Sequence, residues 1–219
     1  DRRDVRNKLL DAARDLFTLK GYEAVSTRRL ARQADTTPAM IHYYFGDKHG
    51  LYRALLEEIL SPTLSRLEAV LAAYRPQKLI SLGDTFHDDL WATRMSEKDH
   101  AQLLAVLAGL QVKWVTGNHD PTPPKGLPGE AAEAFHMTHD GALVMRHEPL
   151  ARHDAGFEAG ELAGHLHPCG KIRQRGRSLR RRCFIADETR AILPAFGALT
   201  GSLNVRDAAF DGLFKGRSY

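Results

Sequence analysis

Residues 27–48 read TRRLARQADTTPAMIHYYFGDK, and this stretch decides the fold of the first part of the chain. A short helix is predicted over residues 28–34, because Ser26 or Thr27 can cap its first turn. Residues 35–38 then favour a turn, since a proline suits the first position of a new helix. The stretch therefore predicts two short helices joined by a tight turn.

Longer helices are predicted on both sides of this pair. Residues 4–20 carry apolar side chains at helical spacing and are followed by a glycine that suits a helix C-cap. A fourth helix is predicted from residue 47 to about residue 60. Ser61 and Pro62 have the character of a new helix start, so we expect a separate helix over residues 63–74 and a domain boundary between residues 60 and 61.

This order of helices is that of a helix–turn–helix motif, whose second short helix presents its N-terminal end to base edges. Small or polar side chains suit that end, and aromatic or cationic side chains nearby can reach phosphates. Exposed N–H groups at the start of the first short helix also favour phosphate. The candidate DNA-binding residues are Thr27, Arg28, Thr36, Thr37, Ala39, His42, Tyr43 and Lys48.

Segments 27–34, 37–48 and 51–52, which contain most of these residues, together resemble the N-terminal domain of TetR-family repressors over about residues 4–60. The resemblance implies that residues 36–43 form the recognition helix and that Tyr43 and Lys48 contact phosphates. Core packing is the alternative role for the aromatic run, and we expect it for Phe45 but not for Tyr43. The sequence departs from the family pattern at Asp35, Thr36 and His42, where a glycine, an apolar residue and an aromatic residue are usual.

The pattern changes after Pro76. A buried strand is predicted over residues 78–82, a helix over 98–110 and a second strand over 111–115, which together suggest an α/β unit. From about residue 130 onward, short strand-like runs alternate with loops. TetR-family proteins dimerise through an all-helical C-terminal domain, and residues 77–219 do not have that pattern.

Three polar motifs follow strand-like segments in this region: GDTFHD at 83–88, GNHD at 117–120 and GHLHP at 164–168. A carboxylate can bridge two cations, an amide ligates without adding charge, and two histidines at i and i+2 of an extended segment point to opposite sides. Two cations held in this way clamp a phosphate and lower the pKa of a bridging water. The three motifs in this order indicate a two-metal phosphoesterase site.

With further segments at 74–76, 146–149, 180–184 and 193–198, these motifs resemble calcineurin-like metallophosphoesterases, in particular the bacterial ones encoded beside DNA ligases. The resemblance covers about residues 61–219. It implies that Asp84 bridges both metals, that His167 serves one of them, and that the other metal site is completed by Asn118, His147 and His165. It also implies that His119 protonates the leaving oxygen, with Asp120 available to orient it.

The superfamily opens with a strand ending in Asp-x-His, and here the helix–turn–helix segment stands in its place. Asp47-Lys48-His49 has that spacing, but it lies at a helix start inside the TetR-like motif, so we interpret it as a coincidence. One metal then keeps only two protein ligands, which hold a divalent ion poorly. We therefore expect one firmly bound divalent ion, with Mn²⁺ as the leading candidate, and a doubtful second site.

The expected fold is two-part: an all-α helix–turn–helix head over residues 1–60, then an α/β metallophosphoesterase sandwich over residues 61–219 that is incomplete at its N-terminal strand. The chain has 219 residues, 43% of them hydrophobic and 26% charged, as in packed globular proteins. No apolar run is long enough to span a bilayer, the N-terminus lacks the core of a secretory signal, and two cysteines form no disulfide framework. We expect a cytoplasmic protein with no membrane partner.

The charge distribution is a weaker indication of a phosphate-containing partner than the motifs are. The net charge is +4, and residues 171–182 read KIRQRGRSLRRR, a strip with cations and no acid. Such a strip attracts phosphates by counterion release, although a solvated hairpin has the same composition.

Three functional hypotheses follow. The leading one is a DNA-binding head fused to a metal-dependent phosphoesterase or nuclease with impaired catalysis, whose substrate is a phosphoester such as nucleic acid. The alternative is a TetR-family transcriptional regulator whose C-terminal half is a non-catalytic scaffold. In the third, the junction joins two incomplete proteins and the chain has no coherent function. The sequence leaves enzyme activity and the oligomeric state open.

Overall fold

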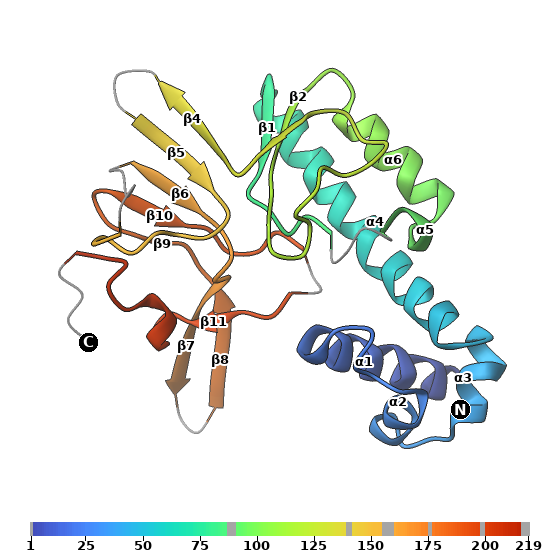
Figure 1. The fold of residues 1–219 in the computed structure, drawn as a ribbon. Helices are drawn as coiled ribbons and strands as arrows, with labels where there is room; N and C mark the ends of the chain where they lie inside the picture. The colour runs from blue at the N-terminus through green and yellow to red at the C-terminus, as the bar shows by residue number, and fades with distance from the viewer. Residues whose placement is uncertain are drawn as a thin grey trace. The chain divides into compact units, whose positions relative to one another are not determined.

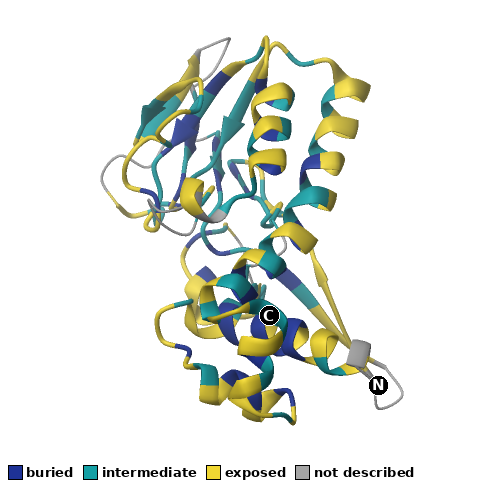
Figure 2. Ribbon diagram, turned by 90° about the vertical axis from the view of Figure 1, so that its right-hand side faces the viewer, coloured by how far each residue is buried: buried dark blue, intermediate teal, exposed yellow. Residues whose placement is uncertain are grey.

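The computed structural model of the chain describes residues 2–86, 91–138, 142–154, 160–174, 177–197 and 200–215. The chain forms two compact units. The first, called the helical unit below, comprises Asp1–Arg75, Leu90–Val106 and Gly197–Gly201. The second, called the sheet unit, comprises Pro76–Asp89, Leu107–Phe196 and Ser202–Tyr219. Figure 1 shows the helices and strands of both units, and Figure 2 shows which residues are buried.

The helical unit begins with α1 (Arg2–Lys20), α2 (Thr27–Gln33) and α3 (Pro38–Phe45), followed by the long α4 (Lys48–Tyr74). The short α5 (Trp91–Arg94) and most of α6 (Glu97–Leu107) complete it. Local signals set the helix ends: the Ser26 hydroxyl accepts the N–H of Arg29 at 3.3 Å, and the Asp47 carboxylate accepts that of Gly50 at 2.7 Å. The helices predicted around the turn are thus confirmed.

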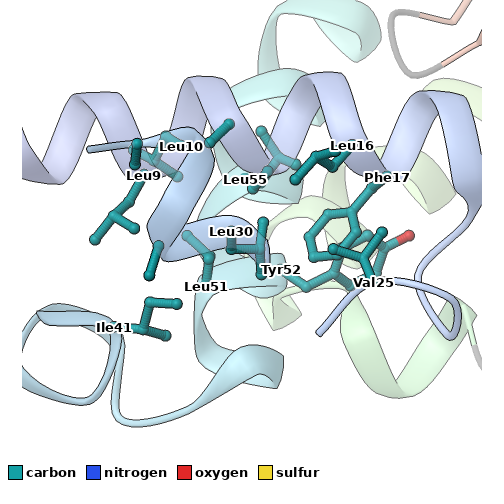
Figure 3. Close-up of a cluster of buried hydrophobic side chains, with 14 of the residues drawn as sticks. Leu9, Leu10, Leu16, Phe17, Val25, Leu30, Ile41, Leu51, Tyr52 and Leu55 are labelled. Atoms are coloured by element: carbon teal, nitrogen blue, oxygen red, sulfur yellow. The ribbon is translucent and has the colours of Figure 1, made fainter. Parts of the chain in front are cut away.

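The core of this unit is built mainly from aliphatic side chains of α1, α2, α3 and α4, with Phe17 and Tyr52 among them. Leu9, Leu30, Ile41, Leu51 and Leu55 have no exposed surface, and they converge in the close-up of Figure 3. Burying a leucine or isoleucine side chain contributes about 1.5–3 kcal/mol, so this cluster supplies much of the unit's stability.

The helix break predicted at Ser61-Pro62 is wrong, because α4 runs through both residues. Pro62 cannot donate a hydrogen bond to the carbonyl four residues earlier, but its fixed φ is compatible with a helix. The hydroxyl of Thr63 donates to the carbonyl of Ile59 at 2.8 Å within the same turn. The expected boundary between residues 60 and 61 therefore falls inside a helix, whereas the compact units divide between Arg75 and Pro76.

Among the described residues, the sheet unit contains three sheets. The first is parallel, in the order β1 (Lys78–Ser81), β2 (Gln111–Val115), β3 (Glu130–Ala132). The second has the order β4 (Ala134–Thr138), β5 (Ala142–Arg146), β6 (Glu161–Ala163), β10 (Arg190–Ile192), β9 (Ile185–Ala186). The third has the order β11 (Leu203–Asn204), β7 (Pro168–Gln174), β8 (Arg177–Arg182), and the short helix η1 (Ala208–Phe210) follows it.

The expected class, a helical head followed by an α/β region, is confirmed, and β1, β2 and α6 lie close to the predicted ranges. Within the described residues, β1 pairs with β2 alone and forms an edge of its sheet. No helix among the described residues is long and apolar enough to cross a membrane.

A buried ionic cluster links three strands of the second sheet. Nη2 of Arg190 lies 2.6 Å from one carboxylate oxygen of Glu161, and Nε of Arg146 lies 3.0 Å from the other. Arg190 also donates to the carbonyls of Leu150 and Leu213. Because Glu161 and Arg190 are both buried, each needs the opposite charge of the other to offset the cost of removing its own charge from water.

Candidate metal centre and DNA-reading helix

Three predicted metal ligands come together in the sheet unit. Asp84 follows β1, His147 follows β5 and His165 follows β6, so each stands just beyond the end of a strand. Their ligand atoms all lie within 4.8 Å of one another. Segments separated by up to 81 residues in sequence (84 to 165) thus supply one cluster of a carboxylate and two imidazoles.

His147 is the centre of this cluster. Its Nδ1 donates to the carbonyl of Leu82 at 2.8 Å, which fixes the ring and turns Nε2 toward the other two residues. Nε2 lies 3.2 Å from Oδ2 of Asp84 and 3.0 Å from Nδ1 of His165. The arrangement leaves one nitrogen of His147 as a ligand atom and holds the other by the backbone.

Two glycines allow the segments to approach this closely. A Cβ on Gly83 would lie 2.5 Å from Nδ1 of His147, and one on Gly117 would lie 2.3 Å from Oδ1 of Asp84. Three other residues of the site are held at positive φ, at 48° for Asp84, 60° for His165 and 44° for His167. Non-glycine residues rarely adopt this conformation, and it concentrates at functional sites.

Asp120 holds the backbone of the Asp84 loop. Its Oδ1 accepts the N–H groups of Asp84 at 2.8 Å and Gly117 at 3.1 Å, and its Oδ2 accepts that of Thr85 at 2.7 Å. The structure places this carboxylate against main-chain donors of two motifs, and its role in orienting the His119 ring stays a prediction. The sequence offered no signal for this binding of main-chain donors beyond the short spacing within GNHD.

The titration behaviour of the cluster follows from its geometry. Burial acts to raise the pKa of Asp84, but hydrogen bonds from His147 and from the main-chain N–H of His119 bring it down to about 2. Burial acts to lower the pKa of His147, but its bonds to Asp84 and Leu82 raise it above the usual value. Burial, and then the charge of His147, lower the pKa of His165. Burial raises the pKa of Asp120 despite its bonds to main-chain N–H groups.

The donor set fits a divalent cation. One anionic oxygen and two imidazole nitrogens that already face one another are ligands used by several first-row ions. Of the other predicted ligands, Asn118 is exposed in the loop after β2, next to His119, whose main-chain N–H donates to Oδ1 of Asp84 at 2.9 Å. His167 is half-buried and, among the described residues, lies outside the group of three. Residues 87 and 88 of the first motif lie outside the described part of the chain.

The predicted DNA-reading residues are all in the helical unit. Thr36 is half-buried in the turn, and Thr37 precedes α3 as its N-cap without using its side chain for the capping bond. Ala39 and His42 are exposed, and Tyr43 is 64% exposed. Thr27 opens α2, and Arg28 contributes with Thr36 to the lining of a surface depression of about 520 Å³. Polar groups thus stand open at the start of the predicted recognition helix.

Several neighbours have structural roles that qualify these assignments. Phe45 packs against the core, as expected. Asp35 has a φ of 52°, which explains why glycine would suit its position. Nδ1 of His42 lies 2.6 Å from the Gly46 carbonyl at the end of α3. The ammonium group of Lys48 donates to the carbonyls of Tyr22 and Val25, so two of its three donors hold the α1–α2 connection.

Asp47 and His49, which have the Asp-x-His spacing, do not join the metal cluster. Asp47 lies in the helical unit and caps α4 through its carboxylate. This role agrees with the interpretation of that spacing as a coincidence.

Comparisons with known proteins match both parts of the chain. Residues 9–55 match the family described as bacterial regulatory proteins, tetR family. The chain is 39% identical over 66 residues to the uncharacterized HTH-type transcriptional regulator YvkB of Bacillus subtilis (strain 168), which is 30% of this chain and 35% of that protein. It is 28% identical over 120 residues to the HTH-type transcriptional regulator BetI of Escherichia coli O17:K52:H18, which is 53% of this chain and 56% of that protein. It thus spans about a third and about half of these relatives' lengths.

Among solved structures, the chain is similar to the nuclease MPE of Pseudomonas putida, with a TM-score of 0.54 and 32% sequence identity. The similarity covers 68% of this chain and 72% of that one.

Proposed function

This chain carries the helix–turn–helix segment of the bacterial tetR family ahead of a region that resembles metallophosphoesterases, and we propose that it couples DNA binding to metal-dependent phosphoester hydrolysis. In this proposal residues 1–60 read DNA and residues 61–219 form a phosphodiesterase or nuclease body of impaired activity. A cytoplasmic location agrees with two cysteines that are both free.

The cluster of Asp84, His147 and His165 is the observation that carries the proposal. We assign these residues, with Asn118 from the neighbouring loop, to one firmly held divalent ion, for which Mn²⁺ is the leading candidate. Asp84 and His167 are assigned to a second, weaker site. A cation held at either site would supply Lewis acidity toward a phosphoryl oxygen and toward a water nucleophile.

The chain's own residues would perform the remaining steps. His147 is fixed by the Leu82 carbonyl, so its Nε2 is ready to ligate without a rotation of the ring. His119 is exposed beside Asp84 and is the residue proposed to give a proton to the leaving oxygen. Asp120 would keep the Asp84 loop and the GNHD loop in register, since it binds main-chain groups of both.

The open edge of β1 supports an impaired rather than a fully active centre. In the family that this region resembles, an Asp-x-His pair at the end of the first strand completes the weaker site, and among the described residues no such strand pairs with β1. Poor occupancy of one cation leaves developing phosphoryl charge less well neutralised, and each 1.36 kcal/mol lost costs about tenfold in rate.

Hydrolysis of bis-p-nitrophenyl phosphate tests the proposal. The metal-free protein should be inactive, Mn²⁺ should produce slow turnover, and excess Mn²⁺ should raise the rate as the weaker site fills. Asp84→Ala should abolish the activity, while His153→Ala, at an exposed histidine of the same unit, should keep it. Turnover in metal-free buffer, or a fully active Asp84→Ala variant, would show that other residues carry the chemistry.

A second candidate function is favoured by the compact core of the head, which is complete without the sheet unit. In this case the chain is a TetR-family transcriptional regulator and the second half is a non-catalytic scaffold. The two functions differ in metal binding, because a scaffold has no need of a tightly bound ion. If the chelated parent and the Asp84→Ala variant both repressed the target as well as the metal-loaded parent, the regulator would be favoured.

A further inference from the structure

A cationic face lies on the third sheet of the sheet unit, away from the residues assigned above. Side chains alternate along β7 and β8, and the register pairs Cys169 with Arg182 and Lys171 with Arg180. One face therefore carries Lys171 and Arg173 from β7 and Arg180 and Arg182 from β8. No residue that β7, β8 or β11 contributes to this face is acidic.

Two of these arginines are held by neutral acceptors. Nε of Arg180 lies 2.9 Å from the sulfur of Cys169, and Nη1 of Arg182 donates to the carbonyl of Ala195 at 2.8 Å. Neither of these contacts neutralises the guanidinium charge.

The other cations surround a hollow in the surface. A depression of about 500 Å³ is lined by Lys171, Ile172, Arg173, Asn204 and Arg206. Lys171, Arg173 and Arg206 are exposed. Oδ1 of Asn204 accepts the main-chain N–H of Arg206 at 2.9 Å, which leaves the amide NH₂ as a donor for a ligand oxygen.

This arrangement is unfavourable for the sheet alone. Lys171 stands directly opposite Arg180, and like charges at such a pair of positions destabilise the pairing of two strands. Among the described residues, the hollow beside this pair is lined by three cations, an amide and one aliphatic residue. A polyanionic ligand would relieve the repulsion.

The apolar residues of the hairpin distinguish nucleic acid from a membrane surface. Ile172 is 64% exposed and Leu179 is 47% exposed, and they form a cross-strand pair on the opposite face. A membrane is contacted best by cations and apolar residues on one face, and that mixture occurs on this opposite face, which also carries Arg181, rather than on the cationic face. Here the cationic face carries donors suited to phosphate oxygens, above all guanidinium groups.

We propose that this cationic face binds the sugar–phosphate backbone of nucleic acid, independently of the helix–turn–helix head. β7 begins directly after His167, so at about 3.3 Å per residue Lys171 lies within about 13 Å of that histidine along the chain. A nucleic-acid strand bound to the face can therefore extend toward the Asp84 cluster. The binding itself needs no metal, so it goes beyond the proposed hydrolysis.

The test is a titration of the full chain with a fluorescent single-stranded oligothymidylate in EDTA over a range of salt concentrations. A single strand is used because the head is built to read duplex DNA, and EDTA separates binding from hydrolysis. The variant Lys171→Gln, Arg173→Gln, Arg206→Gln is compared with a control, Lys78→Gln, Lys125→Gln, Arg181→Gln. The control loses the same charge from exposed positions of the same unit, off the cationic face.

For the parent, the logarithm of the association constant should fall steeply with the logarithm of salt concentration. Three lost phosphate contacts should reduce that slope by about 2 and weaken binding at low salt, while the control keeps nearly the parental slope. Equal losses in both variants would show attraction by net charge alone and overturn the proposal, as would a hairpin variant that binds like the parent. Circular dichroism checks that both variants are folded.

Discussion

The main-chain N–H of Asp84 donates a 2.8 Å hydrogen bond to Oδ1 of Asp120, so a carboxyl group from one motif fixes the backbone of another. The same carboxyl group accepts N–H groups on both sides of the site. The position of the Asp84 ligand atoms therefore depends on a residue that is buried beside them and is not a member of the group of three.

We predict that Asp120→Ala destabilises the sheet unit by about 3 kcal/mol, because the main-chain N–H groups of Asp84, Thr85 and Gly117 lose their shared acceptor in partly buried bonds. Urea unfolding followed by the fluorescence of the buried Trp114 measures the change. Asp120→Asn keeps one acceptor oxygen and should lose less. Glu188→Ala, at an exposed acidic position of the same unit, should change stability by less than about 0.5 kcal/mol. Equal stability of Asp120→Ala and the parent would contradict this role.

Metal content gives the second prediction. Elemental analysis after dialysis should find about one divalent ion per chain, because only one of the two proposed sites has a full set of ligands. His165→Ala should remove that ion, and the exposed His153→Ala should retain it. Two tightly held ions per chain would mean that residues not identified above complete the weaker site.

The third prediction separates two residues of the DNA-reading motif. Tyr43 is exposed, so Tyr43→Ala should weaken operator binding about tenfold, as expected for a lost bond to a charged phosphate, and leave stability unchanged. Lys48→Met should weaken binding and also destabilise the helical unit by about 1–3 kcal/mol, because Tyr22 and Val25 lose a donor to their carbonyls. Gel-shift titrations and thermal unfolding measure the two effects. A Lys48→Met variant of parental stability would make this residue a phosphate contact only.

The fourth prediction concerns the buried ionic cluster. Glu161→Ala should destabilise the sheet unit by about 3–5 kcal/mol, since it leaves the buried charge of Arg190 without its partner. Glu133→Ala, at an exposed position between β3 and β4, is the matched control and should have little effect. Urea unfolding distinguishes them, and a mild effect of Glu161→Ala would mean that the carbonyls of Leu150 and Leu213 are sufficient partners for Arg190.

The fifth prediction is a pH dependence from Asp187. Burial acts to raise its pKa, but bonds from the N–H groups of Lys215 and Thr189, and from Arg152, lower it well below the usual value of 3.8. Because the folded pKa lies below the unfolded one, the stabilisation is fully present above pH 3.8 and is lost as the pH falls below that value. Between about pH 5 and pH 2.5 the parent should therefore lose more stability than Asp187→Asn. If the urea midpoints of the parent and of Asp187→Asn fell equally as the pH decreased, this role of Asp187 would be contradicted. Glu188→Gln, at an exposed position, serves as the control and should behave like the parent.

Much of the candidate site could be predicted because its ligands follow strands in short motifs. GDTFHD, GNHD and GHLHP each contain glycine where the backbone must come close, and the structure brings Asp84, His147 and His165 together. Whether Asn118 and His167 bind the same ions stays a prediction, since their positions in sequence do not determine how far their side chains lie from the cluster.

The sequence by itself determined the local features. Ser26 and Asp47 cap helices through bonds to residues three positions away, and residues 111–115 form a strand over the predicted range. Such features depend on neighbours along the chain, so a local pattern is enough to predict them. Only the tertiary structure decided how Pro62 fits within an unbroken helix, that Lys48 holds the α1–α2 connection, and that Asp120 binds the Asp84 loop. In each case the outcome depends on which donors and acceptors the fold brings within reach, and these come from segments whose meeting no local pattern specifies.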